Sequence, residues 1–228
     1  VEYAVFRFGG TLSFAENLDT FAENLQQTQP TVFFAVPRIW TKFQMGILSK
    51  IPQEKLSKLM KIPVLSWILK RKFNRALGLS KARSIVSGAA PLQETQRTWF
   101  RKIGVSITNG YGMTENCAIT THLGDGIIDK PGSVGLAQPG VELKIDSETS
   151  EIFMRGPFMM KEYYNQPQLT AEVIKNSWLH TGDQGHIDAD GFLFITGRVK
   201  DIFKTSKGEY IEPLVLEGYF GDVLEFEQ

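Results

Sequence analysis

Two short apolar runs end in turns of small residues, and one helical segment separates them. The first is ARSIVSGAAP, residues 82–91, and the second is VSITNGYG, residues 105–112. Between them LQETQRTWFRKIG has the apolar spacing of a helix and ends at Gly104. A helix that connects two strands in this way makes them parallel, so the stretch predicts a parallel sheet with flanking helices.

Segments upstream extend this α/β pattern. TVFFAVP, residues 31–37, is a continuous apolar run that is typical of a buried strand. We expect helices from Leu18 to beyond Leu25, over residues 38–50, and over residues 64–77. In the last of these, the apolar residues are spaced to line one face: Leu65, Ile68, Leu69, Phe73, Ala76 and Leu77. The basic residues lie mostly off this face: Lys70, Arg71, Lys72 and Arg75.

The pattern of the sequence changes near Leu123. Short strand-like segments follow, separated by Gly, Pro and Asp: GSVGLAQPGVELKID, SEIFMRGP, WLHTGD, GHIDADG and FLFITGR. They predict an antiparallel, β-rich and barrel-like subdomain. The composition shifts again after Arg198. We therefore predict three parts: an α/β part over residues 1–122, a β-rich subdomain over 123–199, and the start of a small C-terminal domain over 200–228.

Composition and charge narrow the class of protein. Hydrophobic residues make up 42% and net charge is zero, which fits a soluble globular protein rather than a disordered one. A single cysteine suits the cytoplasm. No apolar run has membrane-spanning length, and we expect that the chain, which lacks an initiator Met, begins inside a larger protein. Between Lys42 and Lys102, 14 basic residues stand against two acidic ones, which fits a solvated helix face or a surface that meets anions.

The turn NGYGMTEN, residues 109–116, is the first candidate site. It follows a strand end, where open α/β sheets bind ligands. Gly110 and Gly112 permit close backbone approach, and Tyr111 offers a ring to a base. Thr114 offers a hydroxyl, and Glu115 a carboxylate of the kind that binds Mg²⁺. Alone, the pattern also fits a Gly-rich turn before a helix N-terminus.

SGAAP, with Gly88, Ala89 and Ala90, is a second strand-end turn whose small side chains would admit a flat ligand. Alone it is equally an ordinary turn.

GFLFITG, residues 191–197, is a predicted strand between an acidic turn with Asp183 and a basic turn with Arg198. A carboxylate can accept hydrogen bonds from two vicinal hydroxyls, as on a ribose. A guanidinium suits sugar or phosphate oxygens. The alternative is a salt bridge that closes the hairpin and contributes about 0–1 kcal/mol.

Other classes of site lack sequence support. His122, His180 and His186 do not have the spacing of zinc ligands, and Cys117 is alone. The sequence has neither GxxxxGK[ST], nor GxGxxG between a strand and a helix, nor GxSxG.

In their order along the chain, these motifs resemble those of adenylate-forming acyl-CoA synthetases. The matching segments are SGAAP, NGYGMTE, GSVGLAQPGVELKI, GPFMMKEYYNQPQLTAEVI and WLHTGDQGHIDADGFLFITGRVKDIFKTSKGEYIEP. TQPTVFFAVPRIWTKF resembles the VPR-x-W segment of the long-chain fatty-acyl branch. The resemblance implies a two-step reaction. A fatty acid carboxylate attacks the α-phosphorus of ATP to give acyl-AMP and pyrophosphate, and the thiolate of coenzyme A then takes the acyl group and releases AMP.

The resemblance also implies where the adenine would bind. Gly88, Ala89 and Ala90 would shape its pocket, with Gly110 and Tyr111 around the base.

The remaining roles that the resemblance implies concern phosphate, metal, ribose and hinge. Thr114 would contact the phosphate and Glu115 would bind Mg²⁺. Asp183 and Arg198 would hold the ribose. Lys200 would be the hinge about which a small C-terminal domain swings between the two half-reactions.

The implied partners are a fatty acid, ATP and coenzyme A, with Mg²⁺ as cofactor and no nucleic acid. The basic stretch 64–77 is a candidate for peripheral membrane contact by a cytoplasmic protein. Trp40, Phe43 and residues 86–90 are candidates for an acyl tunnel.

Three departures limit what we expect of this chain. The phosphate loop of the family would precede Val1, its catalytic lysine would follow Gln228, and IEPLVLEGYFGDVLEFEQ differs from the usual APxxIE. We therefore expect weak nucleotide binding and no turnover from the chain alone. Two alternatives stay open: an enzyme that adenylates amino acids, aryl acids or medium-chain acids, and a truncated non-catalytic nucleotide-binding module.

Overall fold

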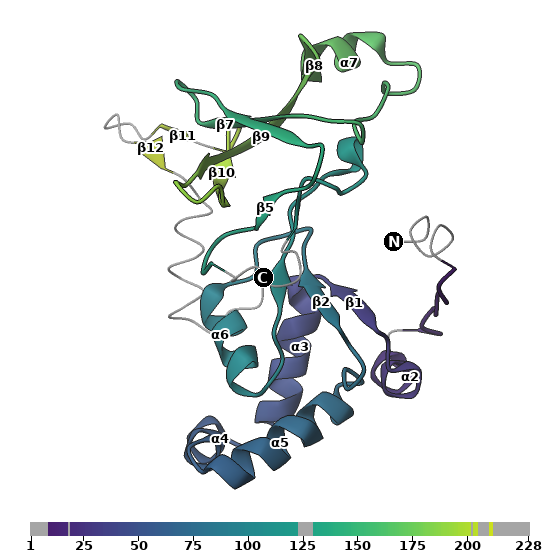
Figure 1. The fold of residues 1–228 in the computed structure, drawn as a ribbon, viewed down its shortest axis with the longest axis vertical. Helices are drawn as coiled ribbons and strands as arrows, with labels where there is room; N and C mark the ends of the chain where they lie inside the picture. The colour runs from purple at the N-terminus through teal and green to yellow at the C-terminus, as the bar shows by residue number, and fades with distance from the viewer. Residues whose placement is uncertain (1–8, 18, 123–129, 202, 205–209, 212–228) are drawn as a thin grey trace. The chain divides into compact units, whose positions relative to one another are not determined.

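The computed structural model describes residues 9–17, 19–122, 130–201, 203–204 and 210–211 (Figure 1). By their contacts these residues divide into two compact units. The first unit comprises Val1–Phe34, Trp40–Ile85 and Trp99–Ser106, and the second comprises Ala35–Ile39, Val86–Thr98 and Ile107–Gln228. The three-part division expected from the sequence stays a prediction, and most of its last part lies outside the described residues.

The helices of the α/β part agree well with the apolar periodicity. They are α2 (Phe21–Thr28), α3 (Pro37–Leu48), α4 (Gln53–Met60), α5 (Pro63–Ala76) and α6 (Glu94–Lys102). The predictions of α3, α5 and α6 are confirmed within two residues at each end, whereas α4 was not predicted. The helix expected from Leu18 begins only at Phe21, and Leu18 itself lies outside the described residues.

An aromatic cluster fills the core of the first unit. Trp40 is fully buried, and its ring centroid lies 5.5 Å from that of Phe33, 5.9 Å from that of Phe43 and 5.4 Å from that of Phe100. All three contacts are edge-to-face, the arrangement that aromatic quadrupoles favour. Trp40, a candidate for an acyl tunnel, is therefore a packed core residue.

The parallel sheet predicted from the strand–helix–strand pattern is present. It contains β1 (Val32–Ala35), β2 (Ser84–Ser87) and β3 (Thr108–Asn109), in that order. Strands β2 and β3 run parallel, with Val86 opposite Thr108 and Ser87 opposite Asn109. Both strands therefore end at the same edge of the sheet.

The burial of β1 differs from the prediction. Phe33 and Ala35 are buried, whereas Val32 and Phe34 are 63% and 49% exposed. Because alternate side chains of a strand point to opposite faces of the sheet, this pattern shows that the apolar run is covered on one face only.

The second unit contains an antiparallel sheet, as the short strand-like segments predicted. Its path runs β10 (Leu193–Arg198), β9 (Trp178–Ile187), β7 (Glu151–Arg155) and β6 (Glu142–Ile145), and β8 (Ile174–Lys175) pairs with β9. Val141, Met154 and Leu179 form a buried cluster on this sheet. The remaining elements are short: η1 (Thr114–Asn116), β4 (Thr121–His122), β5 (Leu136–Ala137), α7 (Pro167–Val173), β11 (Phe203–Lys204) and β12 (Tyr210–Ile211).

Two segments that were predicted as separate strands form one. WLHTGD and GHIDADG contribute to the ten-residue strand β9, Trp178–Ile187. Gly182 lies inside this strand with φ +72°, a left-handed conformation that glycine adopts without steric cost. The strand therefore continues through a sequence that has the composition of a turn.

In the described part of the chain, no helix is both long and apolar enough to cross a membrane.

Candidate active site

The two small-residue turns lie next to each other at the carboxyl edge of the parallel sheet. Ser87 and Asn109 are partners in the β2–β3 ladder, and the backbone N–H of Gly110 donates to the Ser87 carbonyl at 2.9 Å. The two turns therefore leave the sheet from adjacent strand ends. Gly88, Ala89 and Ala90 therefore begin directly after the residue that contacts Gly110.

Two features of the SGAAP turn are unusual for an ordinary turn. Ala89 has φ +68°, which costs a residue with a Cβ atom free energy. The hydroxyl of Ser87 is buried and has no hydrogen-bond partner among the described residues. Strained backbone and an unpaired buried polar group both concentrate at functional sites.

Tyr111, Asp183 and Arg198 form one hydrogen-bonded group. The Tyr111 hydroxyl donates to Asp183 Oδ2 at 2.6 Å, and Arg198 Nε donates to Asp183 Oδ1 at 2.9 Å. The Asp183 side chain is only 11% exposed, whereas that of Arg198 is 64% exposed. The acid and the base of the hairpin thus form the salt bridge that the sequence left open as an alternative, and the Tyr111 hydroxyl joins it. The assignment of Asp183 and Arg198 to a ribose stays a prediction.

A shift in strand register brings the acid and the base together. The sequence suggested that Asp183 and Arg198 lie in turns on either side of a strand, whereas they are direct partners in the β9–β10 ladder. Ile195 pairs with Gly185, but Gly197 pairs with Gln184, so the register shifts by one residue between them. Without this bulge Arg198 would be opposite Gly182, and its side chain would be on the other face of the sheet.

Thr181 holds the backbone of Asp183, and burial keeps the Tyr111 hydroxyl protonated. Thr181 Oγ1 accepts a hydrogen bond from the Asp183 backbone N–H at 3.1 Å and donates to the Ile152 carbonyl at 2.7 Å. Burial, followed by the charge of Asp183, raises the pKa of Tyr111 well above its ordinary value. Tyr111 is therefore a neutral donor across the physiological range, and Asp183 is its acceptor.

The NGYGMTEN turn closes tightly on itself. A Cβ atom at Gly112 would lie 2.4 Å from the backbone carbonyl carbon of Ala118, so only glycine fits there. The backbone N–H of Met113 donates to Asn116 Oδ1 at 3.0 Å, and that of Ala118 to the Met113 carbonyl at 2.8 Å. Gly112 thus allows the chain to approach its own backbone, whereas the sequence suggested approach to a ligand.

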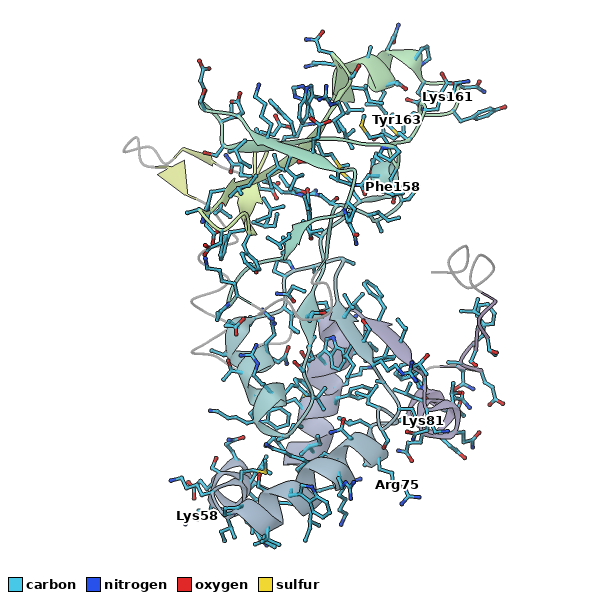
Figure 2. All side chains as sticks on the ribbon, viewed as in Figure 1. Lys58, Arg75, Lys81, Phe158, Lys161 and Tyr163 are labelled. Atoms are coloured by element: carbon cyan, nitrogen blue, oxygen red, sulfur yellow. The ribbon has the colours of Figure 1, made fainter. Side chains whose placement is uncertain are left out.

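Glu115 has a partner that the sequence did not indicate. The Tyr163 hydroxyl donates to Glu115 Oε1 at 2.6 Å, and the Met160 N–H donates to the Glu115 carbonyl at 2.6 Å. The Tyr163 N–H donates to Thr170 Oγ1 at 2.9 Å, which ties the segment to α7 (Figure 2). The tyrosine pair in EYYNQP was the available signal, but nothing in it distinguishes Tyr163 from Tyr164, which is 89% exposed.

The Tyr163–Glu115 contact predicts a pH-dependent contribution to stability. The hydrogen bond to the Glu115 carboxylate, together with burial and repulsion from that charge, raises the pKa of Tyr163 from its ordinary 10.0 to about 12. The neutral hydroxyl therefore stabilises the fold fully below pH 10, and this stability is lost as pH rises through 12. We expect Glu115→Gln to lower the pKa of Tyr163 towards 10.0 in an ultraviolet titration of phenolate. An unchanged titration curve would show that the contact does not form.

Two predicted site residues stand apart from these contacts. Thr114 is exposed at the start of η1, and Lys200 is exposed in the turn after β10. In the described segments no group of three or more His, Cys, Asp or Glu side chains could hold a metal ion. A single carboxylate, Glu115, still fits Mg²⁺, which usually takes one or two carboxylates and completes its shell with water and phosphate oxygens.

Comparison with known proteins agrees with this geometry. The AMP-binding enzyme family matches residues 1–164. Long chain acyl-CoA synthetase 2 of Arabidopsis thaliana is 32% identical over 87% of this chain and 35% of its own length. Long chain acyl-CoA synthetase 5 of the same plant is 28% identical over 98% of this chain and 39% of its own length. The chain thus spans about two fifths of the curated relatives that it matches.

Solved structures share the fold. The ATP-bound RpMatB-BxBclM chimera B1 has a TM-score of 0.73 and 26% identity, over 98% of this chain and 41% of the other. The o-succinylbenzoate CoA synthetase of Bacillus subtilis, in complex with the acyl-adenylate OSB-AMP, has a TM-score of 0.71 and 24% identity, over 96% of this chain and 42% of the other. On the match over residues 1–164, this chain belongs to the AMP-binding enzyme family.

Proposed function

We propose that this chain is the nucleotide-binding part of an ATP-dependent long-chain fatty acid–CoA ligase. The observation that carries the proposal is the group formed by Tyr111, Asp183 and Arg198. Two carboxylate oxygens offer about four acceptor positions, and the protein contacts described here use one on each oxygen. The remaining positions suit the 2′- and 3′-hydroxyls of a ribose.

The protein residues would mainly position the nucleotide. Asp183 accepts from the ribose hydroxyls, and Tyr111, which is held by Asp183, orients its ring towards the base. The exposed Arg198 guanidinium would offer its two terminal nitrogens to sugar or phosphate oxygens, because its contact with Asp183 in the described part of the chain uses Nε. Gly88, Ala89 and Ala90 leave room for the flat adenine ring beside Gly110.

The acidic turn would hold the metal end of the nucleotide. Glu115 would bind Mg²⁺, which neutralises phosphate charge when it is present. Tyr163 fixes the rotamer of this carboxylate through its 2.6 Å hydrogen bond. Thr114, which is exposed at the start of η1, would donate its hydroxyl to a phosphate oxygen. Lys200, just beyond Arg198, would be the hinge of a small C-terminal domain.

The long-chain substrate rests on sequence relatives rather than on a described tunnel. Two relatives named long chain acyl-CoA synthetases match 87% and 98% of this chain. The VPRIW segment also resembles the VPR-x-W segment of the long-chain branch. Aryl acid–CoA ligases share the fold, so an aryl acid is the competing substrate class.

The test is acyl-CoA synthesis by the complete protein, supplied with ATP, Mg²⁺, coenzyme A and either saturated fatty acids of increasing length or benzoate-type acids. We expect the highest kcat/KM for long-chain fatty acids. Preference for an aryl acid would overturn the substrate assignment, and absence of acid-dependent ATP–pyrophosphate exchange with every acid would overturn the ligase.

A further inference from the structure

Helix α5 of the first unit exposes large apolar side chains along one face. Val64, Trp67 and Ile68 are 69%, 58% and 47% exposed, and Ile62 just before the helix is 49% exposed. The helix packs inward through Phe73, which is 7% exposed. The sequence had suggested a single apolar face, whereas the helix has a buried apolar side and an exposed one.

The same exposed face becomes cationic towards the end of the helix. Residues four apart lie above one another on a helix, so Lys72 follows Ile68 and Arg71 follows Trp67 on this face. Arg75 extends the row from Arg71 by another turn, and all three basic residues are exposed. The Arg71 guanidinium carbon lies 4.3 Å from the centroid of the Trp67 ring. Trp67 therefore stands between an apolar end and a basic end.

The sequence around this helix carries no acidic residue. Residues 55–93 contain nine Lys or Arg and no Asp or Glu. Lys58 and Lys61 of the adjoining α4 region are exposed as well, and Figure 2 shows Lys58 on α4 and Arg75 on α5 extending from the helices. Long basic side chains can lie along apolar surface while their charged ends reach outward.

We propose that α5 lies on an anionic lipid bilayer, with Val64, Trp67 and Ile68 at the acyl boundary and Arg71, Lys72 and Arg75 on the headgroups. Because the apolar residues precede the basic ones along the axis, the helix would rest on the bilayer at an angle, with its N-terminal end deeper; tryptophan favours the interface between the apolar and the headgroup regions. Phosphate-bearing headgroups supply the negative charge that the basic end lacks. At 14 residues α5 is too short to span a bilayer, so it would lie in the interface.

The test measures co-sedimentation of the chain with phosphatidylcholine vesicles that contain or lack phosphatidylserine. We expect binding that requires phosphatidylserine and falls at high salt. Arg71→Glu/Lys72→Glu/Arg75→Glu should weaken it by about a hundredfold or more, because each basic residue near an anionic leaflet contributes about fivefold. Val64→Ser/Trp67→Ser/Ile68→Ser should also weaken binding, by about tenfold or more, through lost apolar insertion. The matched control reverses three exposed lysines of the second unit, Lys144, Lys161 and Lys175.

Circular dichroism shows whether each variant is folded. If the triple variants do not fold, a second measurement, the quenching of Trp67 fluorescence by lipids, tests the proposal. Brominated lipids should quench Trp67 fluorescence, measured as the difference between the wild type and Trp67→Phe, which retains an apolar ring. The proposal is overturned by absence of phosphatidylserine-dependent binding, by equal loss in the lysine control, or by absence of Trp67 quenching. It is also overturned if the apolar face pairs two copies of the chain, seen as a wild-type dimer that Val64→Ser/Trp67→Ser/Ile68→Ser converts to monomer.

Discussion

Asp183→Asn is expected to weaken AMP binding by about a hundredfold, since hydrogen bonds to a charged group contribute about 1.5–3 kcal/mol. Asparagine keeps the shape of the side chain but loses its charge and one acceptor oxygen. Its amide would then face the Tyr111 hydroxyl or Arg198 Nε, both of which donate to Asp183 in the wild type. The hydrogen-bonded group of Tyr111, Asp183 and Arg198, which we propose holds the ribose, would therefore be disrupted.

Ligand-observed NMR titration with AMP provides the measurement. Asp19→Asn is the matched control, because Asp19 is an exposed aspartate of the first unit. Thermal unfolding of each variant separates lost binding from lost structure. If Asp183→Asn and Asp19→Asn bind AMP equally well in folded protein, Asp183 does not hold the nucleotide.

Arg97→Ala should produce the largest loss of stability, about 3 kcal/mol, because it removes a fully buried guanidinium that forms a charge pair with Glu94. The Arg97 side chain is fully buried, and its guanidinium donates to Glu94 Oε2 at 2.8 Å and to the Ile107 carbonyl at 3.2 Å. The Gly132 N–H also donates to Glu94 Oε2, at 3.3 Å. Loss of Arg97 thus removes the partner of two acceptors and leaves a cavity next to α6.

Urea unfolding followed by circular dichroism measures this effect. Arg83→Ala, which removes an exposed arginine, is the control and should change stability by less than about 0.5 kcal/mol. Glu94→Gln/Arg97→Met should recover part of the loss, because it removes both charges and restores apolar volume. Equal effects of Arg97→Ala and Arg83→Ala would contradict a buried pair at this position.

Local patterns in the sequence were sufficient to predict much of the fold. Apolar spacing at 3.6 residues predicted α3, α5 and α6, and their alternation with short apolar runs predicted the parallel order of β2 and β3. Both strands were predicted to end in turns of small residues, and the SGAAP and NGYG turns do follow the ends of β2 and β3. These features depend on neighbours in sequence, which is why periodicity reveals them.

Other features depend on partners far apart in sequence and could not be predicted. No residue type or local pattern in the sequence marks the register shift that pairs Asp183 with Arg198. The hydrogen bond between Tyr163 and Glu115 joins residues that are 48 positions apart. Arg97 counted as one of 14 basic residues in a stretch that we expected to be exposed, yet it is a buried residue of α6. The exposed side of β1 shows that hydrophobicity alone does not reveal which face of a strand is covered.

The most direct test of the ribose site compares the binding of AMP and 2′,3′-dideoxy-AMP to the wild-type chain and to Asp183→Asn. The two nucleotides share the base and the phosphate, so a difference in affinity reports the hydroxyls alone. We predict that the wild type binds AMP at least tenfold more tightly than the dideoxy analogue and that Asp183→Asn binds both equally. Equal affinity of the wild type for the two nucleotides would contradict the assignment of Tyr111, Asp183 and Arg198 to the ribose.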